Sequence, residues 1–156
     1  MIEVRPALPD DAAALAELRW EFRIARAPAN EAHDAFVARC GAWMRRELAS
    51  AAHWRAWVAV AGGAIVGQAW VQTIGKMPNP VEERERHAYV SNVFVQPAFR
   101  GGAGRQLLEA ALAWARANDI DRVILWPSAR SVTLYERHGF THNGDVMELA
   151  LGPTRR

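Results

Sequence analysis

VFVQPAFRGGAGR, residues 93–105, is the stretch of the chain that predicts its fold. It begins with β-branched and aromatic residues, as a buried central strand does, and Pro97 ends that strand. Glycines follow, and a helix starts at once, with leucines and alanines at helical spacing on one face. The N–H groups left free at a helix start, together with the helix dipole, form a site for an anion such as phosphate. The residues expected to bind this anion are Arg100, Gly101, Gly102, Ala103, Gly104 and Arg105.

The spacing of these glycines differs from two common nucleotide-binding motifs. No Gly-Lys-Ser/Thr follows them, so the Walker pattern is absent, and G-x-G-x-x-G is not matched either. Taken alone, the glycines also fit a plain strand-to-helix turn that binds nothing.

Hydrophobic periodicity on either side of this stretch predicts a mixed sheet with helices. Strands are predicted at Ile2–Arg5, Trp54–Val60, Ile65–Val71, Tyr89–Val95 and Val123–Trp126, with two more joined by Asn143-Gly144, the second being Val146–Leu151. Helices are predicted from Pro9 to Ala27, over Phe36–Leu48, over Leu107–Ala115 and over Ser131–His138. The order is β-α-α-β-β-β-α-β-α-β-β. We therefore expect an α/β (α+β) fold, with a central sheet of about seven strands and about four flanking helices.

The composition fits one globular domain over residues 1–156, since 51% of the residues are hydrophobic and 23% are charged. The net charge is only +2, and the arginines are spread among the acids, so nucleic-acid binding is not indicated. The first residues lack the pattern of a secretory signal, and no apolar stretch is long enough to cross a bilayer. We expect a cytoplasmic protein with no membrane partner.

Cysteine and histidine usage gives no sign of a metal. Cys40 is the single cysteine, which excludes an internal disulfide and a cysteine-rich zinc site. It lies in an apolar helical stripe, where a buried small side chain is favoured over a catalytic thiol. No histidine pair has the spacing of metal ligands, so no metal is expected.

A second motif lies about thirty residues after the glycines, and the two motifs together indicate a protein family. Leu134-Tyr135-Glu136-Arg137-His138-Gly139-Phe140 matches L-Y-x-x-x-G-F, and residues 95–101 match V-x-P-x-x-R-G. Together the two motifs resemble the GCN5-related N-acetyltransferase (GNAT) superfamily. The opening I-x-V-R-P-A and P-D-D-A-A-A-L also resemble its first strand and helix, so the resemblance covers nearly the whole chain. Trp126-Pro127-Ser128 with Arg130-Ser131-Val132 resembles one uncharacterised bacterial branch.

The resemblance implies an N-acetyltransferase that moves an acetyl group from acetyl-CoA to a primary amine by direct attack in a ternary complex. Acetyl-CoA would lie where the strand near Val95 splays from the strand near Leu125. Tyr135 would protonate the departing thiolate as a general acid. The residues expected to bind the cofactor are the glycine loop, the main chain of Val93, Phe94 and Val95, and Ser131.

A further set of residues is expected to contact the acceptor amine. Asn92, on the strand face of Val90 and Phe94, is a polar group that needs a partner, and it is a candidate catalytic residue. Other candidate acceptor contacts are Ser91, Ser128 and an aromatic wall of Trp20, Trp57, Trp70 and Trp126, for which packing is the alternative. The base is left open among Glu21, Glu31, His33, His87, the acids of 82–85 and a water on Ser91 or Asn92.

The glycine loop departs from the family pattern, because Phe99 stands where Arg or Gln is usual and the loop is one residue short. This departure keeps a second hypothesis open, a non-catalytic CoA-binding sensor or interaction module. A small-molecule amine is the expected acceptor, and a protein N-terminus is the alternative. Acetylation of charged tRNA would need a clustered basic face that the sequence lacks. A homodimer is left open.

Overall fold

The computed structural model describes residues 1–153. The chain forms two compact units, which divide between Trp126 and Pro127.

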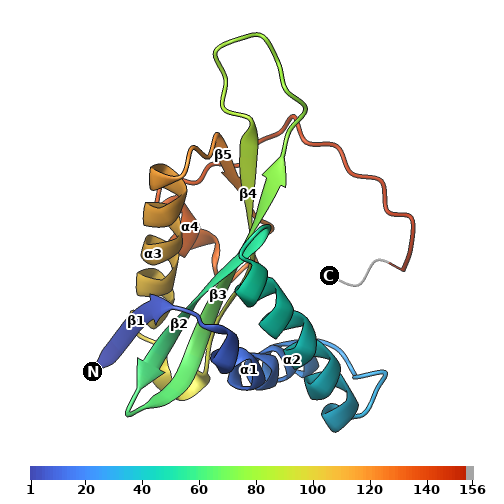
Figure 1. Ribbon diagram of the computed structural model, residues 1–156, viewed down its shortest axis with the longest axis vertical. Helices are drawn as coiled ribbons and strands as arrows, with labels where there is room; N and C mark the ends of the chain where they lie inside the picture. The colour runs from blue at the N-terminus through green and yellow to red at the C-terminus, as the bar shows by residue number, and fades with distance from the viewer. Residues whose placement is uncertain (154–156) are drawn as a thin grey trace. The chain divides into compact units, whose positions relative to one another are not determined.

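The first unit is built on a five-stranded sheet in the order β1-β2-β3-β4-β5 (Figure 1). The strands are β1 (Ile2–Pro6), β2 (Trp54–Ala61), β3 (Ala64–Gly75), β4 (Arg86–Val95) and β5 (Arg122–Ile124). Neighbours are antiparallel except β4 and β5, which are parallel. Gly62 and Gly63 have φ angles of 56° and 79°, as a two-residue hairpin turn requires, so the hairpin predicted there is confirmed.

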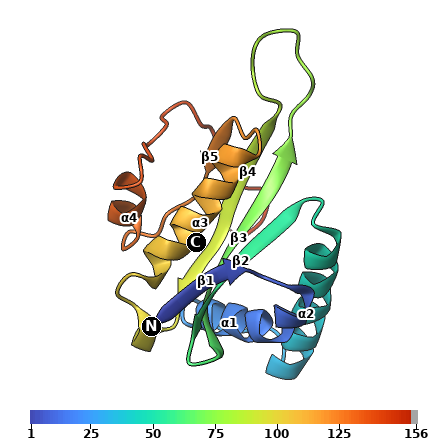
Figure 2. The same cartoon turned by 60° about the vertical axis from the view of Figure 1, so that its left-hand side comes forward.

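Helices cover both faces of this sheet (Figure 2). They are η1 (Pro9–Asp11), α1 (Ala12–Ile24), α2 (His33–Ser50), η2 (Pro97–Phe99) and α3 (Ala103–Ala117). One core lies under α3 and includes Trp57, Val90 and Leu107. The other lies under α1 and α2 and includes Leu15 and Trp70. Alternate residues of the strands serve the two cores, which is why β2 and β3 are apolar on both faces.

The second unit contains one described helix, α4 (Val132–Glu136), which is followed by Gly139 with a φ of 89°. The two strands predicted around Asn143-Gly144 are wrong, because residues 137–153 contain no strand. A local turn does form there, since the Asp145 N–H donates to Asn143 Oδ1 over 3.0 Å. The flanking residues Val146, Met147, Leu149 and Leu151 are exposed. A lone hairpin is marginal without a third strand or a covering layer, so periodicity was not sufficient here.

The described sheet therefore has five strands where about seven were predicted. Apart from the short 3-10 helices η1 and η2, the strands and helices from β1 to α4 follow the first nine predicted elements in order, and the mixed α/β class is confirmed.

Candidate active site

Strand β4 loses its neighbour half-way along its length. It pairs with β5 only at His87, Ala88 and Tyr89, whereas it continues along β3 as far as Val95. Within residues 1–126, the β5 side of residues 90–95 thus has no partner strand. This edge offers main-chain donors and acceptors to an extended ligand, in the way a sheet edge accepts an added strand. One acceptor is already used, since Arg100 Nε donates to the Val95 carbonyl over 3.3 Å.

The glycine turn that follows leads directly into α3. Gly101 and Gly102 have φ angles of 123° and 131°, a region that side chains disfavour, and the space where a Cβ would lie is open at both. No side chain caps the first turn of α3, so its leading N–H groups face outward without an intrahelical acceptor. Arg105 lies in that turn, with Nε 3.8 Å from Glu109 Oε1. The turn has the geometry and charge of an anion site.

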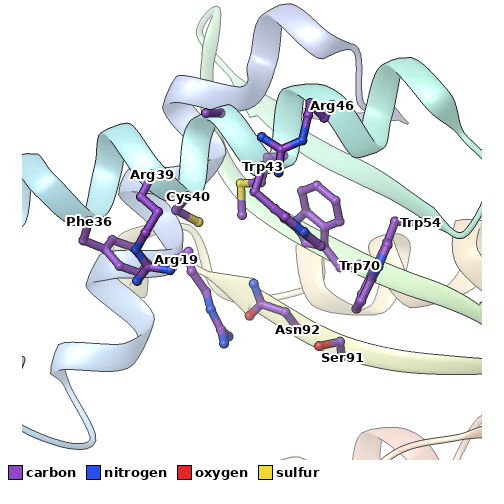
Figure 3. Close-up of a pocket in the computed structure, with 12 residues that line it drawn as sticks. Arg19, Phe36, Arg39, Cys40, Trp43, Arg46, Trp54, Trp70, Ser91 and Asn92 are labelled. Carbon is purple, nitrogen blue, oxygen red and sulfur yellow. The ribbon is translucent and has the colours of Figure 1, made fainter.

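A cavity of about 550 Å³ lies between α1, α2 and the start of this free edge (Figure 3). Its lining residues are Arg19, Phe36, Arg39, Cys40, Ala42, Trp43, Met44, Arg46, Trp54, Trp70, Ser91 and Asn92. None of these twelve is a carboxylate or a histidine. The cavity is therefore aromatic and cationic.

Asn92 on β4 is the polar centre of the cavity. The residue is 5% exposed, and neither its Oδ1 nor its Nδ2 has a hydrogen-bond partner. Buried amides almost always have partners, so this one is available to a ligand or a water. Trp70 pairs with Asn92 and Val71 with Val90, which makes Ser91 the extra residue of a β-bulge. The bulge lets consecutive side chains, Ser91 and Asn92, line one cavity.

The bulge also corrects the predicted strand face. Val90 belongs to the core under α3, whereas Asn92 lines the cavity with Trp70, so these two residues do not share a face. Phe94 does point to the side of α1, where its ring lies 5.3 Å from that of Phe22.

One end of the cavity is a cluster of tryptophans. The ring centroids of Trp43 and Trp54 are 5.3 Å apart, and Trp70 lies 5.8 Å and 6.3 Å from them. Trp70 is fixed by its Nε1, which donates to the buried Gln68 Oε1 over 2.8 Å.

The other end carries Arg19 and Arg39 (Figure 3). Arg39 is bound to Glu31 and lies over the Phe36 ring. Arg19 is half-buried, and burial lowers the pKa of its guanidinium. Burial raises the pKa of the neighbouring Cys40 thiol, which keeps that group neutral.

The sequence matches the model of the Acetyltransferase (GNAT) family over residues 13–140. The chain belongs to the GNAT family. No curated protein sequence is significantly similar to it. Among solved structures, a predicted acetyltransferase from Clostridium acetobutylicum with acetyl-CoA has a TM-score of 0.82 at 22% identity, covering 97% of both chains. A GCN5-related N-acetyltransferase from Ralstonia eutropha JMP134 has a TM-score of 0.75 at 23% identity, covering 97% of this chain and 100% of that one.

A third similar structure bears on the acceptor. It is an aminoglycoside acetyltransferase from an uncultured soil metagenomic sample, in complex with sisomicin. Its TM-score is 0.70 at 14% identity, and the match covers 98% of this chain and 97% of that one. At these identities the likeness concerns the fold. These structures show that the chain has the GNAT fold, and the features that would select its acceptor are those of its own cavity.

Other candidate residues lie elsewhere in this GNAT domain. Trp57 packs on Trp114 in the core under α3, and Trp126 is exposed beside Tyr89. Trp20 packs on His33 and Phe36 without lining the cavity. The four tryptophans of the expected wall are therefore separated, and only Trp70 reaches the cavity.

Three site candidates belong to the second unit. The hydroxyls of Ser128 and Ser131 are 2.9 Å apart, and the Tyr135 ring lies 5.5 Å from that of Phe140. Their roles at the cofactor and acceptor stay predictions.

Most of the candidate bases already have a partner, and none of their side chains lines the cavity. Glu21 accepts a hydrogen bond from Gln96, Glu31 binds Arg39, and His33 contacts Glu17 and Asp34, which raise its pKa. His87 has a buried Nδ1 with no partner, but it does not line the cavity. The acids of 82–85 lie on the exposed β3–β4 loop, where Glu83 binds Lys76.

Sequence reasoning missed Arg19, Arg39, Arg46, Trp43 and Trp54 as cavity residues. A signal was present on α2, because Phe36, Arg39, Cys40 and Trp43 recur at steps of three and four residues. A stripe that holds an arginine among aromatic residues indicates a polar pocket more than a closed core.

Residues 1–153 contain no cluster of histidine, cysteine or acidic side chains arranged for a metal. None of the described helices is long and apolar enough to cross a membrane.

Proposed function

We propose that this GNAT protein is an N-acetyltransferase that uses acetyl-CoA and acts on the primary amine of a small molecule. One observation carries the proposal. Strand β4 lines the cavity with Ser91 and Asn92 and, within residues 1–126, has no partner strand on its β5 side at residues 93–95, and η2 then leads to the uncapped glycine turn of α3. An acceptor site, a site for an extended chain and an anion site thus follow one another along β4 and the turn after it.

The residues present fit coenzyme A. The open space at Gly101 and Gly102 and the free N–H groups of the first turn of α3 suit a pyrophosphate. The free β4 edge suits the amides of pantetheine. When bound, acetyl-CoA supplies the thioester that the amine attacks. Because both reactants would be bound along β4, the amine and the thioester would be held in a fixed orientation and would not have to meet by random collision.

The chain's own groups would assist that attack in three ways. Asn92, whose amide is unpaired, orients the amine through Oδ1 or holds a water. A main-chain N–H near Val95 polarises the thioester carbonyl. Tyr135 donates its phenolic proton to the departing sulfur. No lining side chain is a carboxylate or histidine, so we assign proton removal from the amine to a water held by Ser91 and Asn92.

The first test is binding. Addition of about 1 mM acetyl-CoA should raise the thermal midpoint, because a ligand that binds only the folded state stabilises it. Absence of any shift would refute the proposal. Thiol release in the presence of pooled amines then separates an enzyme from the alternative, a CoA-binding module. A shift without transfer to any amine or peptide N-terminus would favour the module.

Tyr135→Phe tests the general acid. Loss of the hydroxyl should lower kcat by roughly a hundredfold or more, because the thiolate then departs without a proton. Acetyl-CoA should still stabilise the variant. Tyr89→Phe is the matched control, since the chain has only two tyrosines and Tyr89 packs against Trp126. An unchanged kcat in Tyr135→Phe would remove Tyr135 from the mechanism and leave the transfer reaction itself standing.

A further inference from the structure

The cavity holds more positive charge than its own residues neutralise. Arg39 is bound to Glu31, but Arg19 and Arg46 have no carboxylate within ion-pair distance among residues 1–153. Arg46 is exposed and solvated, whereas Arg19 is half-buried on α1. A guanidinium withdrawn from water without an anion is unfavourable, so Arg19 is stabilised when a ligand brings one.

Asn92 lies on the same side of the cavity as Arg19. Figure 3 shows the Arg19 side chain extending from α1 toward the strand that carries Asn92. The Arg19 guanidinium can donate hydrogen bonds to an anion, and the unpaired amide oxygen of Asn92 can accept one from an amine. A ligand with a carboxylate and an amine on neighbouring atoms would satisfy both.

The tryptophan cluster sets the rest of the ligand. Trp43, Trp54 and Trp70 meet edge to face or tilted, with centroids 5.3–6.3 Å apart, at the opposite end of the cavity from Arg19 and Arg39. Trp43 and Trp54 are only partly buried, so the cluster keeps aromatic surface available to the cavity. Flat apolar groups pack favourably on such surfaces.

We infer that the acceptor is an amine that also carries a carboxylate and a flat apolar body, the class to which the aromatic α-amino acids belong. The inference rests on the proposed function and names the substrate class of that same site. The carboxylate pairs with Arg19, the amine contacts Asn92, and the apolar body lies on the tryptophans.

This class also explains how an amine reacts in a cavity without a side-chain base. A nearby cation lowers the pKa of an ammonium group, and Arg19 neutralises the carboxylate that would otherwise raise it. A larger fraction of the bound ligand is then free amine, with water as the proton acceptor. Conversely, an amine with several positive charges, such as sisomicin, meets Arg19 and Arg46, which have no ion-pair partner within residues 1–153, and no acidic side chain lines the cavity.

The test compares matched pairs of acceptors by thiol release with saturating acetyl-CoA. The pairs are L-tryptophan with tryptamine and L-phenylalanine with phenethylamine, which differ only in the carboxylate. We expect the carboxylate to raise kcat/KM by roughly tenfold or more, as a charge-assisted hydrogen bond in a partly buried site does. Sisomicin should be acetylated more slowly than L-tryptophan.

Arg19→Gln should bring the ratio of kcat/KM within each pair close to one, because kcat/KM falls for the amino acid and not for the amine that lacks the carboxylate. Arg19→Lys keeps the charge and should retain part of the ratio. Arg116→Gln is the control, because Arg116 is an exposed arginine in the last turn of α3 and does not line the cavity. Stabilisation of each variant by acetyl-CoA verifies that it is folded.

Equal kcat/KM for tryptophan and tryptamine, or a ratio that survives Arg19→Gln, would overturn the inference. Calorimetry with L-tryptophan and CoA-loaded protein gives a readout independent of turnover. Absence of both turnover and saturable binding would also overturn it, while stabilisation by acetyl-CoA and transfer to another amine would leave the proposed function intact. Loss of acetyl-CoA binding itself would refute the proposed function.

Discussion

At the residue scale, Asp11 fixes the start of α1 to β1. Arg5 donates to its two carboxylate oxygens over 2.8 Å and 3.0 Å, and the Leu8 N–H donates to Oδ2 over 2.7 Å. Asp11→Asn should lower the free energy of unfolding by about 1–3 kcal/mol at neutral pH, as expected for hydrogen bonds to a charged group. Urea denaturation measures the difference. Asp10→Asn is the control, because Asp10 is exposed, and its pairing with Arg45 should contribute less than about 1 kcal/mol.

The same residue predicts a pH dependence. The hydrogen bonds from Arg5 hold the pKa of Asp11 below its ordinary value of 3.8. The stabilisation is therefore fully present above that ordinary value, which is the unfolded-state pKa, and it is lost as the pH falls through the lower folded-state pKa. The difference in the free energy of unfolding between wild type and Asp11→Asn should therefore become smaller as the pH falls. A difference that stays constant down to about pH 2 would show that the carboxylate charge is not the cause.

At the element scale, Gly67 sets the distance between β3, β4 and α3. A Cβ there would lie 3.0 Å from Val95 Cγ2, 3.1 Å from the Phe94 carbonyl and 3.3 Å from Leu107 Cδ1. Gly67→Ala should lower the free energy of unfolding by about 1–3 kcal/mol, because the strand and helix must separate. Gly75→Ala, in the same strand with open space at its Cβ, is the matched control and should change stability by less than about 1 kcal/mol. Equal effects of the two changes would contradict this packing argument.

Elements set by their own periodicity could be predicted, whereas elements that need a partner could not. The amphipathic pattern of α3 and the glycine pair between β2 and β3 act locally, so both were found. The segment 146–151 alternates like a strand but pairs with none. The candidate site follows the same division. Asn92 is conspicuous as a polar residue in an apolar strand, but the bulge at Ser91 and the approach of Arg19 from α1 depend on tertiary packing.

At the scale of the whole molecule, the second unit is too short to fold alone. Residues 127–153 contain one five-residue helix, and several apolar side chains near the end are exposed. Chains below about 40 residues rarely bury enough surface without further support. We therefore propose that residues 1–156 act as one cooperative domain.

Acetyl-CoA should make that cooperativity measurable. All seven tryptophans lie before Pro127, so tryptophan fluorescence reports on the first unit alone, while amide exchange at residues 131–139 reports on the second. If residues 93–105 and the segment with Ser131 and Tyr135 bind one cofactor, its addition should slow exchange in both and raise the fluorescence melting midpoint. At about a hundred times the Kd, the stabilisation should be about 2.7 kcal/mol in both probes. Exchange at 131–139 that remains as fast as in an unfolded chain, while the first unit is stabilised, would show that the second unit takes no part in binding and that the single-domain proposal is wrong.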